Sequence, residues 1–306
     1  MSALSKDNIK SRKDTRKKVE EHGAGEKLWS WVKTLVGAII VVTIINGLAI
    51  ASFVVPTPSM EKTVMTGDFL FVNKFIYGPS TPQVIPILNI PLPFFRFPAF
   101  REPQKGDVIV FIFPGNRDEV EATEFQYYLK RCVATAGDSL EIRNNHIYVN
   151  HKEVFLAKNG FYDSSVPEIP SEKWQTFPYG RGYTRDNYGP IRIPKEGDVI
   201  PLSMSSLHEW AVFIQREGHK ITSDGNSIFV DGTAVTSYKV QRDYCFGMGD
   251  NRDHSLDSRY WGFIPEENIV GTPVVVYWSW DTNLPLSQFL DKITSTRWAR
   301  IGTIIR

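Results

Sequence analysis

Cysteine is scarce in this chain, which has only Cys132 and Cys245 among its 306 residues. Two cysteines cannot build the disulfide framework that holds many small secreted domains together, and we expect both thiols to be reduced. An excess of charge of one sign is also missing, because 35 basic and 34 acidic residues leave a net charge of +1. The molecule as a whole is therefore not expected to bind nucleic acid through its net charge.

What the chain does contain favours β-structure. The 19 prolines, 19 phenylalanines and 12 tyrosines indicate a fold rich in strands and turns rather than a helical bundle. Apolar residues make up 42% and charged residues 23%, which is typical of a folded globular protein.

One long hydrophobic run is present, and no second run reaches the length needed to span a membrane. Residues 34–55 read TLVGAIIVVTIINGLAIASFVV and contain no charged side chain. As a helix this run would be about 33 Å long, which matches a bilayer core of about 30 Å. It is too long for the apolar part of a cleaved signal peptide, which has about 7–15 residues. We therefore predict one transmembrane helix at residues 34–55.

The flanks of this run predict its orientation. Residues 1–33 carry nine Lys and Arg against five acidic residues. By the positive-inside rule this tail stays in the cytoplasm, and residues 56–306 lie outside. Binding of nucleic acid by the basic tail is the alternative reading. A second apolar stretch at residues 82–100 is broken by prolines and cannot be a helix. It either packs on the domain or dips its phenylalanines into the outer leaflet.

Short strands are predicted throughout the outer part of the chain. Residues 68–78, 107–114 and 272–280 are rich in β-branched and aromatic side chains, and residues 138–154 contain an Asn-Asn turn that predicts a hairpin.

The sequence also contains an internal repetition. Residues 104–111 recur as residues 195–202, and residues 143–154 recur as residues 223–235, in the same order. This indicates either a duplicated β unit or hairpins that share their turn chemistry.

A serine, Ser59, directly follows the apolar run, in the segment VVPTPSMEKTVMTGD. Proline and threonine are common in linkers, but a serine held at a membrane surface also suits a nucleophile. A lysine activates a serine if burial or a nearby cation lowers its pKa far below about 10.4. Lys130 lies in the apolar stretch EFQYYLKRCVATAGD, where alternation points either Lys130 or Arg131 inward. A lysine on the surface is the simpler alternative.

Histidine chemistry has weaker support. No two of the six histidines have the spacing of H-E-x-x-H, and no G-x-x-x-x-G-K-[ST] loop is present. No metal or organic cofactor is implied, because a serine activated by a lysine needs none. His254 lies in a polar loop, where a triad with Ser59 is conceivable, although a lone loop histidine usually makes only local hydrogen bonds. This loop, GMGDNRDHSLDSRYWGFIP at residues 247–265, is rich in Gly, Asp and Arg and is expected to be ordered by its own ion pairs.

Taken together, these stretches resemble the motifs of bacterial type I signal peptidase, a membrane-anchored serine protease with a Ser/Lys dyad. The resemblance covers most of the chain from residue 34 on. It implies that Ser59 is the nucleophile and Lys130 the general base. It also implies an oxyanion hole formed by Thr57 and the Ser59 N–H, and a hydrogen bond from Ser255 that orients the lysine. The residues implied to support the site through ion pairs are Arg131, Asp250, Asp257 and Arg259.

The implied fold is mainly β, an antiparallel catalytic sheet with an inserted β-rich region and one N-terminal transmembrane helix. We expect a cytoplasmic tail at residues 1–33, the helix at 34–55, the catalytic domain at 56–157 with 244–306, and the insertion at 158–243. The implied function is removal of N-terminal signal peptides on the outer side of the bacterial cytoplasmic membrane. Secretory preproteins, the lipid bilayer and the export translocon are the expected partners, with no role for nucleic acid. A catalytically silent homologue that binds signal peptides or scaffolds secretion is the alternative.

Overall fold

The computed structural model describes residues 26–42, 49–79, 84–85, 90–91, 95–155, 157–163, 165–167 and 175–306. The chain divides into two compact units, residues 1–49 with 80–95 and residues 50–79 with 96–306.

The first unit is small in its described part. Residues 26–42 are helical, and β3 (Val84–Ile85) pairs antiparallel with β4 (Ile90–Pro91). Among the residues that the structure describes, no helix is both long enough and apolar enough to cross a bilayer. Nine of the 19 residues of the apolar stretch at residues 82–100, Phe94 among them, lie outside the described residues.

The predicted helix at residues 34–55 is wrong at its C-terminal end. Ile50–Val54 forms strand β1, which pairs antiparallel with β2 (Asp68–Asn73). The sequence IASFV is compatible with a pleated strand, and β2 pairs with the backbone hydrogen-bonding groups on the side of β1 that faces it. Residues 43–48, between the helix and the strand, lie outside the described residues.

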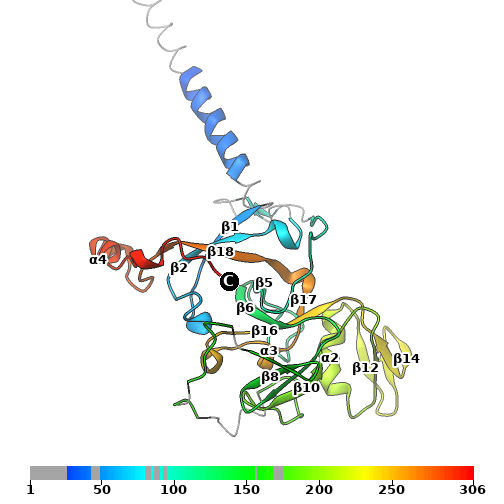
Figure 1. The fold of residues 1–306 in the computed structure, drawn as a ribbon. Helices are drawn as coiled ribbons and strands as arrows, with labels where there is room; N and C mark the ends of the chain where they lie inside the picture. Colours follow the sequence, from blue (N-terminus) through cyan, green and yellow to red (C-terminus); the bar gives the residue numbers. More distant parts are fainter. Residues whose placement is uncertain are drawn as a thin grey trace, which may run out of the picture. The chain divides into compact units, whose positions relative to one another are not determined.

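The second unit is built on a seven-stranded antiparallel sheet with the order β1-β2-β18-β5-β6-β16-β17 (Figure 1). Its other strands are β5 (Val108–Ile112), β6 (Tyr127–Ala134), β16 (Tyr244–Met248), β17 (Ile264–Pro265) and β18 (Ile269–Ser279).

Both faces of this sheet are buried around β5. Val108 and Val110 belong to one hydrophobic cluster, whereas Ile109 and Phe111 belong to another. Successive side chains of a strand point to opposite faces, so the run VIVF fills two cores at once. A strand with two buried faces holds its neighbour β6 in a fixed position.

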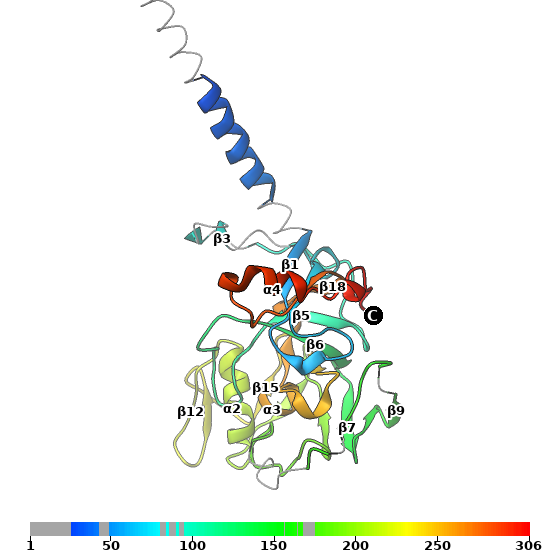
Figure 2. The same ribbon diagram turned by 90° about the vertical axis from the view of Figure 1, so that its left-hand side faces the viewer.

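Smaller sheets follow β6 along the chain, and the turned view in Figure 2 shows several of their strands below the main sheet. A four-stranded sheet has the order β10-β7-β8-β9, a three-stranded sheet the order β12-β13-β14, and β11 pairs with β15. The bounds are β7 (Ser139–Arg143), β8 (His146–Val149), β9 (Lys152–Val154), β10 (Tyr188–Arg192), β11 (Val199–Pro201), β12 (Ile221–Ser223), β13 (Ile228–Val230), β14 (Thr233–Val235) and β15 (Ser237–Lys239).

The helices of this unit are short. The α-helices are α2 (Leu207–Arg216), α3 (Ser258–Trp261) and α4 (Phe289–Thr294). The 3-10 helices are η1 (Pro58–Met60), η2 (Phe75–Tyr77), η4 (Arg252–His254), η5 (Glu266–Asn268), η6 (Leu286–Gln288) and η7 (Trp298–Arg300).

The hairpin predicted at residues 138–154 is confirmed, because β7 pairs with β8 across Asn144 and Asn145, whose φ angles are 47° and 70°. The repeated stretches also share a structure. β8–β9 and β13–β14 are hairpins whose two turn residues all have positive φ. Such turns match the twist of the flanking strands, which accounts for the shared turn chemistry.

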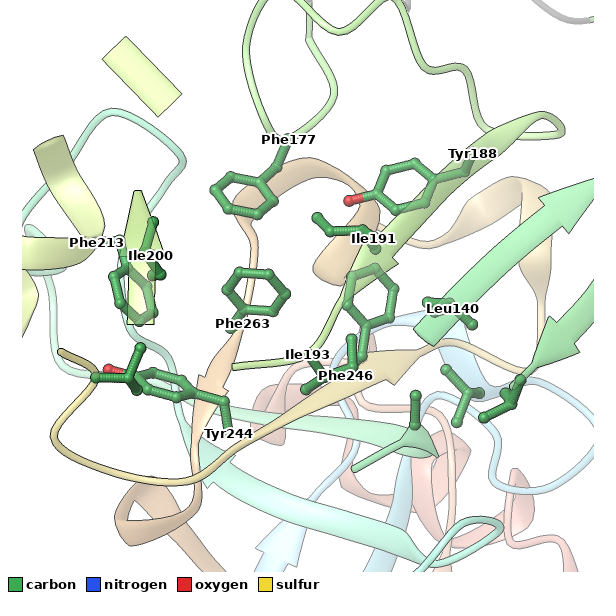
Figure 3. Close-up of a cluster of buried hydrophobic side chains, with 14 of the residues drawn as sticks. Leu140, Phe177, Tyr188, Ile191, Ile193, Ile200, Phe213, Tyr244, Phe246 and Phe263 are labelled. Carbon is green, nitrogen blue, oxygen red and sulfur yellow. The ribbon is translucent and has the colours of Figure 1, made fainter. Parts of the chain in front are cut away.

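The expected boundary between residues 157 and 158 does not separate two domains. β10, inside the predicted insertion, pairs with β7, which lies outside it. One hydrophobic cluster also joins side chains from both sides of the boundary, among them Tyr188, Phe213 and Phe246 (Figure 3). The rings of Tyr188 and Phe246 are 5.6 Å apart. Burial of these shared aromatic surfaces makes residues 158–243 part of the same compact unit.

Candidate functional site

Ser59 and Lys130 meet in the second unit. Ser59 is held in η1, which begins with Pro58, and Lys130 lies in the middle of β6, opposite Ile109 of β5. Lys130 Nζ and Ser59 Oγ are hydrogen-bonded at 2.7 Å. Both residues are buried, with 4% of Lys130 and 7% of Ser59 exposed. The lysine therefore points inward, as the family resemblance implied.

Burial changes the proton affinity of this lysine. Loss of solvent lowers the pKa of Lys130 from 10.5 to about 8. The Asp257 carboxylate opposes this effect, and the Arg259 guanidinium reinforces it. The apolar surroundings dominate, because an ammonium group loses more than an amine when water is removed. A substantial fraction of Lys130 is thus neutral near pH 8.

Thr57 lies beside the serine and is exposed. Its Oγ1 lies 3.4 Å from Ser59 Oγ, and the residue precedes the first turn of η1 with an extended backbone. The Thr57 hydroxyl is therefore available close to the reactive oxygen.

The loop that follows β16 holds the serine segment through its backbone. The Asn251 N–H donates to the Ser59 carbonyl at 3.1 Å, and Asn251 Nδ2 donates to the Pro58 carbonyl at 3.3 Å. Gly249 permits this approach, because a Cβ at that position would lie 2.5 Å from the Ser59 carbonyl oxygen. The loop after β16 is therefore packed directly against the backbone of the serine segment.

Two buried ion pairs fix the loop and the lysine strand. Arg131 binds Asp250 through Nε–Oδ1 at 2.7 Å and Nη2–Oδ2 at 2.6 Å. Arg259 binds Asp257 through Nε–Oδ1 at 2.9 Å and Nη2–Oδ2 at 2.8 Å. Thr63 Oγ1 also donates to Asp250 Oδ2 at 2.5 Å. Bidentate ion pairs of this kind add a defined geometry to the attraction between the guanidinium and the carboxylate.

The expected hydrogen bond between Ser255 and Lys130 is not formed. Ser255 is buried near the site, but its Oγ has no hydrogen-bond partner among the described residues. This Oγ lies over Gly249, where an added Cβ would be only 2.2 Å away. The hydrogen bond of the Lys130 amino group goes to Ser59 instead.

Sequence reasoning missed the segment at residues 157–163. The Phe161 N–H donates to the Asp250 carbonyl at 2.9 Å, and the Arg252 N–H donates to the Phe161 carbonyl at 3.1 Å. Lys62 Nζ lies 3.6 Å from the centre of the Phe161 ring. No sequence motif predicts these backbone hydrogen bonds or the Lys62–Phe161 contact, because they join segments that are far apart in the chain.

His254, the other candidate partner of Ser59, is not placed beside it. His254 is exposed, and no hydrogen bond joins it to Ser59. Within the described residues, no group of three or more His, Cys, Asp or Glu side chains is placed to hold a metal ion.

Comparison with known proteins gives consistent matches. The chain matches the family described as signal peptidase, peptidase S26, over residues 28–278. A signal peptidase I of Helicobacter pylori is 29% identical over 261 residues, covering 82% of this chain and 83% of that protein. A signal peptidase I of Aquifex aeolicus is 29% identical over 241 residues, covering 79% and 80%. A crystal structure of a signal peptidase I from Enterococcus faecalis V583 has 19% identity and covers 56% of this chain and 97% of that one, with a TM-score of 0.25, which is too low to bear on the fold.

Proposed function

The chain belongs to the signal peptidase, peptidase S26, family, and we propose on this premise that it removes N-terminal signal peptides from exported preproteins. The observation that supports this most directly is the 2.7 Å contact between Lys130 Nζ and Ser59 Oγ. A buried serine beside a buried lysine of lowered pKa has the components of a nucleophile and its base.

The first step uses the neutral form of the lysine. Lys130 Nζ accepts the proton of Ser59 Oγ while that oxygen attacks the scissile carbonyl carbon. The developing oxyanion accepts hydrogen bonds from the Ser59 N–H and the Thr57 hydroxyl. When the tetrahedral intermediate collapses, the Lys130 ammonium gives its proton to the leaving amine, and an ester on Ser59 remains.

The second step reverses these roles. Lys130, neutral again, takes a proton from a water molecule that attacks the ester carbonyl. The second intermediate expels Ser59 Oγ, which regains its proton from Lys130. Arg131 with Asp250 and Arg259 with Asp257 keep the strand and the loop in register while the charge on the lysine changes.

The membrane arrangement is part of the proposal. The uncharged run that starts at residue 34 and the basic tail before it support a single span with the N-terminus in the cytoplasm. Because Ile50–Val54 forms strand β1, this span ends before residue 50. The catalytic unit then lies on the outer side, where it meets the bilayer, the translocon and the preprotein's cleavage site.

Cleavage of a purified preprotein with an Ala-x-Ala site by the detergent-solubilised full-length chain tests this function. We expect the parent to cut at that site and both Ser59→Ala and Lys130→Ala to lose activity by several orders of magnitude. Ser205→Ala and Lys152→Ala, at exposed positions, are matched controls that retain activity. Cleavage that survives Ser59→Ala would exclude this nucleophile. A parent that binds the preprotein without cutting it would favour a silent homologue.

A further inference from the structure

The proposed mechanism leaves the two cysteines unused, although they lie close to its lysine. Cys132 is in β6 and Cys245 in β16, both are fully buried, and both belong to the hydrophobic cluster that includes Trp261 and Ile264. The Cys132 thiol donates a hydrogen bond to the Ala134 carbonyl at 3.6 Å. The structure holds both as free thiols.

The two strands are direct neighbours in the main sheet (Figure 1). Cys132 lies opposite Gly247, and the register of β16 shifts between Phe246 and Gly247. Such a bulge turns neighbouring side chains out of strict alternation. It lies between Cys245 and Gly247, the residue opposite Cys132.

The paired segments of β6 and β16 at Cys132 and Gly247 lie next to Lys130. Lys130 precedes Cys132 by two positions, so their side chains share a face of β6. Gly247 of β16 also lies close to the Lys130 side chain, since a Cβ added to Gly247 would lie 3.1 Å from Lys130 Cβ. A covalent link between Cys132 and Cys245 would therefore hold the lysine strand against the strand that leads into the Asp250 loop.

We propose that Cys132 and Cys245 form an intramolecular disulfide when the chain folds in an oxidising compartment, and that this bond ties β6 to β16 beside Lys130. The chain has no other cysteine, so no alternative pairing within one molecule exists. The bond would close a long loop, which is the situation in which a disulfide restricts the unfolded chain most.

The oxidant is another disulfide, either a small-molecule one or that of a thiol–disulfide oxidoreductase. The thiolate of one cysteine attacks a sulfur of the donor, forms a mixed disulfide and releases one donor thiol. The thiolate of the second cysteine then attacks the protein sulfur of that mixed disulfide and releases the second donor thiol. The protein loses two protons and two electrons, and the donor disulfide is reduced to two thiols.

Burial determines when this exchange happens. The neighbouring Cys132 thiol and loss of solvent raise the pKa of the Cys245 thiol well above its usual range. A buried thiol of raised pKa is a poor attacking group. The bond is therefore expected to form before β16 closes on β6, and the folded reduced protein is expected to resist oxidation.

Refolding of the full-length chain in detergent with reduced and oxidised glutathione tests the proposal without any need for peptidase activity. After denaturation in iodoacetamide, intact mass is measured. We expect a monomer two hydrogens lighter than the reduced chain, with no alkyl group added. Cys132→Ala and Cys245→Ala are matched controls, since each leaves one thiol that is alkylated or bound to glutathione.

Two alkyl groups on the refolded parent, or a disulfide-linked dimer in its place, would overturn the proposal. The oxidised monomer is also expected to unfold roughly 5–10 °C above the same protein folded in reductant. Equal midpoints would show that the bond does not tie the two strands together.

Discussion

Lys130 is a single residue whose burial enables the proposed chemistry and lowers stability at the same time. Folding lowers its pKa from 10.5 to about 8. Between these two pH values the unfolded chain binds more protons than the folded chain, so the free energy of unfolding rises with pH across this window. Below pH 8 the folded protein carries the whole cost of the buried charge, about 3 kcal/mol at most.

Lys130→Met is accordingly expected to stabilise the protein at pH 7 while it abolishes activity. The gain should be about 1–3 kcal/mol at pH 7 and should shrink as the pH rises from 8 to 10.5. Urea unfolding of the detergent-solubilised protein at both ends of that window measures it. Lys152→Met, at an exposed position, is the control and should change little. A Lys130→Met protein that is less stable than the parent at pH 7 would contradict this expectation.

The same residue predicts the pH dependence of cleavage. Only neutral Lys130 accepts the Ser59 proton, so kcat/KM should rise with pH and reach half of its plateau near pH 8. A pH series between 6 and 9.5 on a preprotein substrate measures this. A profile that is flat across pH 8 would show that another group is the base.

Asp250 illustrates the opposite case, in which a buried charge has a partner. Asp250→Ala leaves Arg131 buried without a counter-charge, and we expect a loss of about 3–5 kcal/mol in the free energy of unfolding. Glu141→Ala breaks a more exposed ion pair, with Arg143, and should cost under about 1 kcal/mol. Chemical denaturation of the two variants compares them directly. Losses of equal size would show that burial of the Arg131–Asp250 pair is unimportant.

At the scale of elements, the site depends on how closely the loop after β16 approaches η1. A methyl group on Gly249 would lie 2.2 Å from Ser255 Oγ and 2.5 Å from the Ser59 carbonyl oxygen, so something must move. Displacement of a reacting group by about 1 Å lowers rates about a hundredfold. Gly249→Ala should therefore lower kcat by about that factor.

Gly271→Ala is a matched control for that variant. It is equally crowded, with the Asn73 carbonyl oxygen 2.4 Å from an added Cβ, but it lies in β18. Both variants should be destabilised, whereas only Gly249→Ala should lose kcat beyond the loss of folded protein. Equal kcat per folded molecule in the two variants would count against the role of the loop.

At the scale of the whole molecule, residues 50–79 and 96–306 form one compact unit although the sequence suggested an insertion. Phe213 of α2 packs on Tyr244 of β16 with ring centres 4.9 Å apart, so its removal should weaken the catalytic region as well. We expect Phe213→Ala to cost about 3–5 kcal/mol and to shift one cooperative transition. Calorimetry measures this, and a second transition that stays unshifted would show an independent domain.

The strands were the most predictable part of the fold. The strand β5 (VIVFI) and the Asn-Asn turn after β7 can be predicted from short stretches of sequence. Strand propensity and turn chemistry depend on residues that are close together in the chain. The C-terminal end of the apolar run was not predictable, because IASFV is apolar enough to continue a helix and is also compatible with a strand. The pairing of β1 with β2 decided between them.

The sequence alone identified Ser59, Lys130 and the polar loop as candidates for the functional site. Each of them belongs to a short segment with an unusual composition. Their meeting at 2.7 Å, the burial that lowers the pKa of Lys130, and the contact of Phe161 with Asn251 belong to the tertiary structure. These features arise between segments separated by tens of residues or more, where spacing along the chain carries no information about distance. Solvent exclusion, which tunes the lysine, exists only once those segments have packed together.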